Sequence, residues 1–250
     1  MSWNHREGAP FRARKLLADL DHHGVQLDGQ VLDALTHLDR VEAEKPAEPD
    51  PQALHDAIVA GASTADLDAL VLTELGSHRI RAAYAQARLT AAVRVLAAVL
   101  TDRDQIHAQL ADKAADCIDK LERIAALDAP LDTLIREGRH DDARLLADAH
   151  ITGETLNQLY QLRDLALIPA SADLRPYSLD VSRWRNPDKV AHGHGTTATE
   201  LFVDGLRRGG TLWYPSADEQ AEALAPLVAE VERTAQRKHE QDWGVGAIAR

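Results

Sequence analysis

The stretch from Ser77 to about Leu127 contains neither proline nor glycine, and alanine, leucine and arginine dominate it. These residues are strong helix formers, so the stretch predicts one helix of about 45 residues with a length of roughly 70 Å. Such a helix is longer than an ordinary globular domain is wide. It therefore has to pair along its length, either within the chain or with another chain.

An apolar seam runs along this stretch in alternating steps of four and three residues, as in coiled coils and long helical hairpins. Only Arg103 and His107 interrupt the seam, and there we expect the helix to bend, open or fix its register. From Leu89 to Leu100 the apolar residues extend almost all round the helix, which predicts packing by several neighbours. The seam positions are Leu89, Val93, Leu96, Leu100, Arg103, His107, Leu110, Ala114, Cys117, Leu121 and Ile124.

The rest of the chain is also predicted to be mainly helical, so the expected fold is an all-α helical bundle with one long, central, coiled-coil-like helix. Residues 1–45 are predicted to form an N-terminal helical hairpin, and residues 46–168 a central body with the long helix at about 77–127. Residues 169–196 are predicted to be an extended, mostly irregular arm, and residues 197–250 to form C-terminal helices.

Prolines, glycines and helix caps set these boundaries. Three prolines within Glu44–Pro51 cannot continue a helix, so this segment is expected to be a connection. Gly76 is expected to close a helix that begins at Ser63. Capping boxes are predicted to begin the last two helices, at Thr197 and at Ser216.

The predicted arm has the composition of a binding segment. Prolines interrupt it, and the segments PYSLDVSRWR and GTLWYPS each contain enough β-branched and aromatic residues for one short strand. In a chain of net charge −12, its basic and aromatic side chains would suit the acidic helical face of a neighbouring copy. The predicted partner-binding residues are Tyr177, Arg183, Trp184, Arg185, Lys189 and Trp213.

Within the sequence VAHGHGTT, His192 and His194 lie one residue apart, which is a spacing that zinc sites use. A zinc site needs at least one more ligand, and no second cluster with metal spacing occurs in the sequence. We therefore predict a polar turn that the two glycines make possible, with neither metal nor cofactor. A metal site built on His192 and His194 is the alternative.

A second pair, His55–Asp56, is superficially similar to the His-Asp pair of HD-type metal phosphohydrolases. This resemblance implies a metal-dependent hydrolase with His37 and Asp102 as further ligands. The pair lacks the glycine and lysine that usually follow it, and an acid in the first turn stabilises a helix without any chemistry. The sequence has no phosphate-binding loop, nucleophile elbow or dinucleotide fingerprint, so we predict that the protein is not an enzyme.

Charge and cysteine content narrow the function further. A net charge of −12 disfavours attraction to a phosphate backbone, so no sequence-specific nucleic-acid partner is expected. Cys117 is the only cysteine, which excludes a disulfide framework within the chain. The sequence contains no apolar signal segment and no run of 18 apolar residues, so we expect a cytoplasmic protein without a membrane partner.

In the style of its composition, the chain resembles helical proteins from the structural and assembly modules of phages that infect high-GC actinobacteria. The resemblance lies in the excess of arginine over lysine, in RIRAAYAQARLTAAVRVLAAVL and in the basic-aromatic segment RPYSLDVSRWRNP. It implies a virion component without catalysis, such as a minor capsid, connector or assembly protein. We therefore expect a homo-oligomeric structural protein that binds itself or other virion proteins, in the producing cell's cytoplasm and in the virion. A soluble helical adaptor or regulator is a further alternative.

Overall fold

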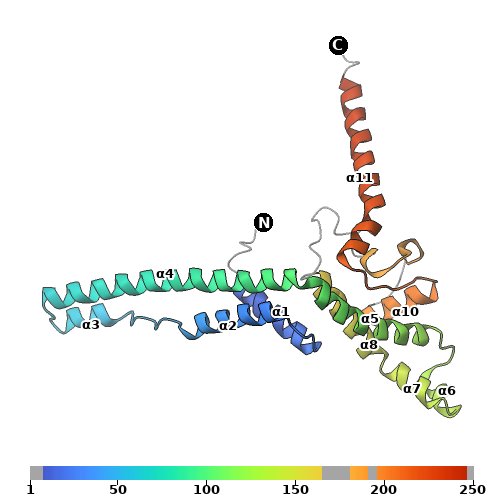
Figure 1. Cartoon of the computed structure of the whole chain (residues 1–250), viewed down its shortest axis with the longest axis horizontal. Coiled ribbons are helices and arrows are strands. Elements are labelled where there is room, and N and C mark those ends of the chain that lie inside the picture. Colours follow the sequence, from blue (N-terminus) through green and yellow to red (C-terminus); the bar gives the residue numbers. More distant parts are fainter. Residues whose placement is uncertain (1–7, 165–180, 191–195, 247–250) are drawn as a thin grey trace. The chain divides into compact units, whose positions relative to one another are not determined.

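The computed structural model describes residues 8–164, 181–190 and 196–246 (Figure 1). Within these ranges the regular secondary structure is helical, and the β-type pairing is limited to one isolated bridge between Trp184 and Leu212. The predicted all-α fold is confirmed. The chain divides into two compact units, residues 1–102 and residues 103–250, each with its own core.

The first unit is built on one long helix, α4 (Thr64–Thr101). Three shorter helices pack along one side of it: α1 (Ala9–His22), α2 (Gly29–Ala43) and α3 (Ala53–Val59) (Figure 1). Its fully buried core lies where α1 and α2 meet the C-terminal half of α4, and alanines on α4 let the backbones approach closely. Core residues are Ala13, Leu17, Leu20, Val31, Leu38, Ala91, Ala92, Val95 and Val99.

Glu42 of α2 links three helices of the first unit. Its carboxylate accepts a hydrogen bond from Arg14 Nη2 of α1 (2.6 Å) and one from Arg88 Nε of α4 (2.8 Å). Burial would raise the pKa of Glu42, but the hydrogen bonds from these two guanidinium groups outweigh it and lower the pKa below its usual value. All three side chains are partly exposed, so the network orients the helices more than it stabilises them.

The prediction that Gly76 closes a helix is wrong. α4 begins at a capping box formed by Ser63 and Asp66, as the sequence indicates, but it continues through Gly76 to Thr101. A glycine inside a helix costs only about 1 kcal/mol relative to alanine, and the strong helix formers on both sides carry the helix across it. A Cβ atom placed on Gly76 would meet nothing within 4 Å, so packing within the described chain does not require a glycine there.

The predicted continuous helix at 77–127 is two helices, and a single coiled-coil-like helix is not confirmed. α4 ends at Thr101 and α5 (Arg103–Ala125) begins after Asp102, whose ψ of 9° leaves the helical range. The break lies directly beside Arg103, the first of the two polar interruptions in the seam. Thr101 and Asp102 are poor helix formers, and the Thr101 hydroxyl donates back to the Ala97 carbonyl (3.0 Å).

The predicted apolar seam coincides with the buried face of α5 but not with the buried face of α4. In α5 the predicted residues Leu110, Ala114, Cys117, Leu121 and Ile124 are all buried. In α4 the buried face is instead the one that carries the alanines and valines of the core, while Val93 and Leu100 are both 46% exposed. Because α4 is apolar almost all round, the pattern alone did not identify which face the other helices cover.

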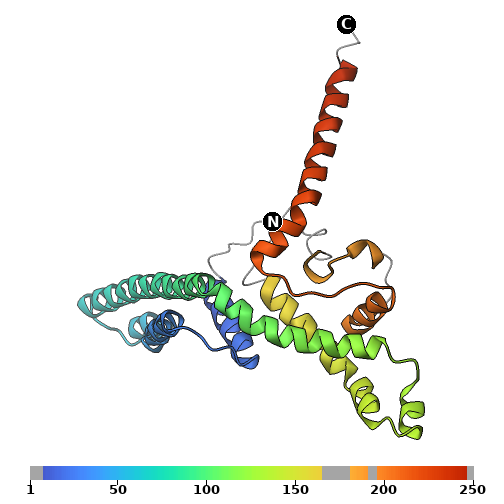
Figure 2. The ribbon, with the colours of Figure 1, turned by 45° about the vertical axis from the view of Figure 1, so that its right-hand side comes forward.

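The second unit has its core where α5, α8 (Ala149–Leu162) and α10 (Ala198–Arg207) pack on one another (Figure 2). Gly153 allows α10 to approach α8 closely, since a Cβ there would lie 2.7 Å from the Thr199 Cα. Three short elements and a C-terminal helix complete the unit. They are α6 (Leu131–Arg136), α7 (His140–Ala147), the 3₁₀ helix η3 (Pro187–Lys189) and α11 (Ala217–Gly246).

The different burial of two seam leucines makes a direct test of this fold. Leu121 of α5 is fully buried, so Leu121→Ala should lower the free energy of unfolding by about 2–5 kcal/mol. Leu100 of α4 is about half exposed, so Leu100→Ala should cost less than about 1 kcal/mol. Urea unfolding followed by circular dichroism measures both. Equal losses for the two variants would contradict the assigned faces.

Candidate functional site

The candidate site lies in the second unit, where two segments far apart in the sequence are held together. Arg185 N donates to Thr211 O (2.9 Å), and Trp213 N donates to Arg183 O (3.1 Å). The Asn186 side chain adds two further bonds, from its Nδ2 to Gly209 O (3.0 Å) and from Thr211 N to its Oδ1 (2.8 Å). This pairing replaces the two short strands that the sequence predicts, and it brings Trp184, Arg185 and Trp213 into one cluster.

Trp184 lies in the core of the unit and is only 6% exposed. Its ring packs against two glycines, because a Cβ on Gly205 or on Gly210 would lie within 2.7 Å of it. The Phe202 ring is also in contact, with 6.5 Å between the ring centroids. Residues 181–190 therefore belong to the packed unit and are not part of an extended arm, and the remaining residues of the predicted arm up to 195 lie outside the described ranges.

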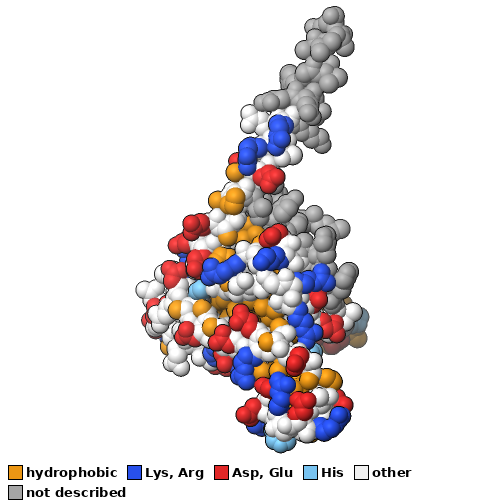
Figure 3. Space-filling model, turned by 90° about the vertical axis from the view of Figure 1, so that its right-hand side faces the viewer, with side chains coloured by type: hydrophobic (Ala, Val, Ile, Leu, Met, Phe, Trp, Pro, Cys, Tyr) orange, Lys and Arg blue, Asp and Glu red, His pale blue; other side chains and the backbone are white. Residues whose placement is uncertain are grey.

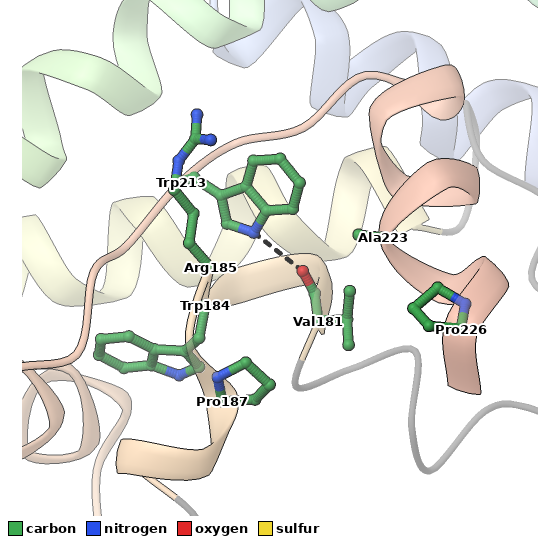
Figure 4. Close-up of a pocket in the computed structure, with 7 residues that line it drawn as sticks. All are labelled: Val181, Trp184, Arg185, Pro187, Trp213, Ala223 and Pro226. Atoms are coloured by element: carbon green, nitrogen blue, oxygen red, sulfur yellow. Dashed lines mark hydrogen bonds between the residues drawn. The ribbon is translucent and has the colours of Figure 1, made fainter. Parts of the chain in front are cut away.

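A pocket of about 310 Å³ opens beside this cluster (Figure 4). One wall is the Trp213 indole, whose Nε1 donates to Val181 O (2.8 Å), and the Arg185 guanidinium lies over the same ring at 4.6 Å from its centroid. Apolar side chains supply most of the remaining lining, and the start of α11 closes one side. The pocket is lined by Val181, Trp184, Arg185, Pro187, Trp213, Ala223 and Pro226.

A buried arginine fixes the segment that carries Trp213. Arg163 is fully buried, and its guanidinium lies over the rings of both Tyr160 (5.1 Å) and Tyr214 (4.9 Å). Its charge is paired with Asp164 (2.6 Å), and it donates to Ser182 O (2.9 Å). A buried charge that has both a counter-ion and hydrogen bonds is costly to disturb, so this group holds the surrounding backbone in one arrangement.

The two tyrosine hydroxyls attach the same segment to α8. Tyr160 donates to Trp213 O and Tyr214 donates to Leu159 O, both at 2.9 Å. Burial raises the pKa of both hydroxyls well above their usual value, so they remain protonated donors. His107 of α5 stacks on Tyr214, with its Nε2 2.9 Å from Pro215 O, and burial lowers its pKa despite that hydrogen bond. These contacts hold the backbone of the pocket wall to α8 and α5.

The structure brings together part of the predicted partner-binding set. Trp184, Arg185 and Trp213 line the pocket, whereas Arg183 is not among the lining residues and its guanidinium lies over the Tyr160 ring, 5.6 Å from the centroid. Lys189 is exposed on η3, and Tyr177 lies outside the described residues. The sequence analysis missed Val181, Pro187, Ala223 and Pro226. Only Pro187 offered a signal, since it follows the predicted aromatic anchor Trp184 by three residues and a proline there can form an apolar wall.

Metal chemistry receives no support from the described residues. Among the side chains that the structure describes, no group of three or more from histidine, cysteine, aspartate or glutamate is placed to hold a metal ion. The structure therefore does not form the group that the hydrolase hypothesis requires, which would consist of His55, Asp56, His37 and Asp102. His192 and His194 lie outside the described residues.

Comparison with known protein families, with characterised proteins and with solved structures found no match. The function of this chain is therefore argued from its own residues.

Trp184 and Arg185 are adjacent in the sequence, but we expect their replacement by alanine to change the free energy of unfolding by different amounts. Trp184→Ala should lower the free energy of unfolding by about 3–5 kcal/mol, because it empties a large volume in the core. The exposed Arg185→Ala should change it by less than about 1 kcal/mol. Urea denaturation monitored by circular dichroism gives both values. An unchanged stability for Trp184→Ala would show that this segment is not packed as described.

Proposed function

We propose that the protein is an assembly protein without catalysis, and that its second unit binds an extended segment of another protein chain. The pocket beside Trp213 is the observation that carries this proposal. It is formed by two tryptophans, two prolines and a guanidinium, and the Arg163–tyrosine group fixes the backbone of its wall. A site whose wall is already held in place by hydrogen bonds loses less conformational freedom when it binds.

The chemistry of the pocket favours a peptide that carries an apolar side chain next to an acidic one. Tryptophan and arginine are the residues that contribute most often to binding energy at protein interfaces. Grooves lined by aromatic rings also accept proline-rich segments, which are already extended before they bind. The Arg185 guanidinium is exposed at the rim, where a carboxylate of the partner would find an opposite charge.

The surface charge is consistent with a protein partner. On the face drawn in Figure 3, acidic and basic side chains are interspersed and apolar side chains lie between them, without one large area of a single sign. The whole chain carries a net charge of −12. Binding to nucleic acid relies on concentrated positive charge, so this face supports a protein partner over a nucleic acid.

Two narrower proposals concern the partner. The assembly is a virion of a phage that infects high-GC actinobacteria, and the partner is another virion protein or a second copy. The support for this is the resemblance in composition and in the basic-aromatic segment. The alternative is a soluble helical adaptor, which would use the same pocket for a regulatory partner.

Filling the pocket tests the proposal without removing any of its walls. Peptides selected from a random display library on the wild-type protein should carry proline or an aromatic residue beside an acidic one. Ala223→Trp should weaken the binding of these peptides at least about tenfold, because the new indole occupies the pocket. Fluorescence anisotropy with labelled peptides measures the dissociation constants.

The matched control is Ala221→Trp, which places the same side chain on an exposed position of α11 outside the pocket lining. This variant should bind the peptides as the wild type does. If no peptide is enriched, or if both tryptophan variants behave alike, the pocket is not the binding site.

A further inference from the structure

One side of α4 is apolar and uncovered over the N-terminal half of the helix. The shorter helices of the first unit pack on the side that carries Val95 and Val99. Since an α-helix turns by about 100° per residue, Leu72 and Leu75 lie on the opposite side, and Val71 lies on the edge of that side. These three side chains are 68%, 56% and 39% exposed, respectively. A contiguous patch of exposed apolar side chains along one helix face is typical of a surface that binds a partner.

Two opposite charges flank this apolar group on the same face. Asp68 precedes it, and Arg79 follows three helical turns later, at a separation of about 16 Å along the helix axis. Both side chains are exposed, and neither is paired with another residue in the described part of the chain. Gly76 lies between them, and the space beside it is open.

The face is complementary to itself in an antiparallel helix pair. If a second α4 lies antiparallel with its Arg79 opposite Asp68, the two-fold axis passes between residues 73 and 74. By the symmetry of that axis, each contact then occurs twice. The register pairs Asp68 with Arg79, Leu72 with Leu75, Val71 with Gly76, and Ala65 with Ala82.

This register suits each of the residues that it pairs. The two leucine pairs form an apolar centre, and the helices pack along it. The Asp68–Arg79 pairs lie at the two ends of the apolar centre, where opposite charges fix orientation and register. A parallel pair would instead place Asp68 beside Asp68 and Arg79 beside Arg79, so the charges favour the antiparallel arrangement.

We propose that residues 64–83 of α4 form an antiparallel interface between two copies of this chain, with Asp68 of one copy paired with Arg79 of the other. The interface lies wholly within the first unit and uses no residue of the pocket. It therefore adds a second surface to the proposed function and does not depend on the first.

A lipid surface fits this face less well. α4 is, by length and composition alone, the one helix in the described residues able to cross a membrane, and core helices of soluble proteins pass the same test. Asp68 and Arg79 lie on the exposed face itself, and charged side chains are expensive inside a bilayer. In the helix pair each of them meets an opposite charge.

A charge exchange tests the pairing. Wild-type protein should sediment as a concentration-dependent dimer in analytical ultracentrifugation. Asp68→Lys and Arg79→Glu should each raise the dimer dissociation constant about tenfold, because each places like charges opposite one another twice. The double variant Asp68→Lys/Arg79→Glu restores opposite charges in the same register, so its dissociation constant should return to within about threefold of the wild type.

Glu74→Lys is the matched control, since it reverses an exposed charge of the same helix on the side away from Leu72 and Leu75. It should leave the dimer unchanged, and circular dichroism should show that every variant keeps its helix content. The proposal is overturned if the wild type is monomeric at all concentrations, or if the double variant does not recover. It is also overturned if the wild type inserts into phosphatidylcholine vesicles and the charge variants insert equally.

Discussion

The length of α4 (Thr64–Thr101) determines how much of the first unit lies outside its buried core. The helices of 14, 15 and 7 residues pack on one side of this 38-residue helix, so its other side has no covering helix within the described part of the unit. The fully buried residues of α4 all lie in its C-terminal half, at Ala91, Ala92, Val95 and Val99. The N-terminal half therefore extends from this core with an apolar face still in water, and that face supplies the proposed contact between copies.

The second unit is organised by the pairing of residues 183–186 with residues 209–213. Backbone hydrogen bonds and the Asn186 side chain hold these two segments together. The buried Arg163 and its two tyrosines attach them to α8. Trp184 is buried in the core of the unit, whereas Trp213 forms one wall of the pocket. If the two units act as proposed, a dimer through α4 would present two pockets, and a partner with two binding segments would gain affinity from both.

Sequence reasoning recovered the helical class, the caps at Ser63, Thr197 and Ser216, and the buried side of α5. These features depend on local patterns, which a single sequence contains. It named Arg103, directly after the break at Asp102, as a place where the helix could bend, but it predicted one continuous helix there and a helix end at Gly76. Both errors depend on small energy differences between neighbouring residues. In α4 it found the apolar residues but not which of them the other helices cover.

At the candidate site, sequence reasoning identified three of the residues that line the pocket, but it predicted an exposed position for one of them, Trp184, that is buried. Trp184, Arg185 and Trp213 were found from their composition, and the structure places them together at one pocket. The interpretation of Trp184 as an arm anchor was wrong, since only the tertiary structure shows that two distant glycines, at 205 and 210, make room for its ring. Of the four further lining residues, Val181 and Pro187 lie in the same segment as Trp184, whereas Ala223 and Pro226 belong to α11, which no local pattern connects to that segment.

A distance measurement between copies tests most directly the claim that this chain assembles through α4. Spin labels are placed at Glu74→Cys in one sample and at Thr90→Cys in another, both in a Cys117→Ala background, and pulsed electron paramagnetic resonance reports the separation. Position 74 lies on the outer side of the proposed pair, so the antiparallel arrangement predicts labels that are level with each other along the helix axis and separated only by the width of two helices. At position 90 it predicts about 50 Å of separation along the helix axis, because that residue is far from the two-fold axis. Equal short distances at both positions, or no coupling at either, would contradict the account.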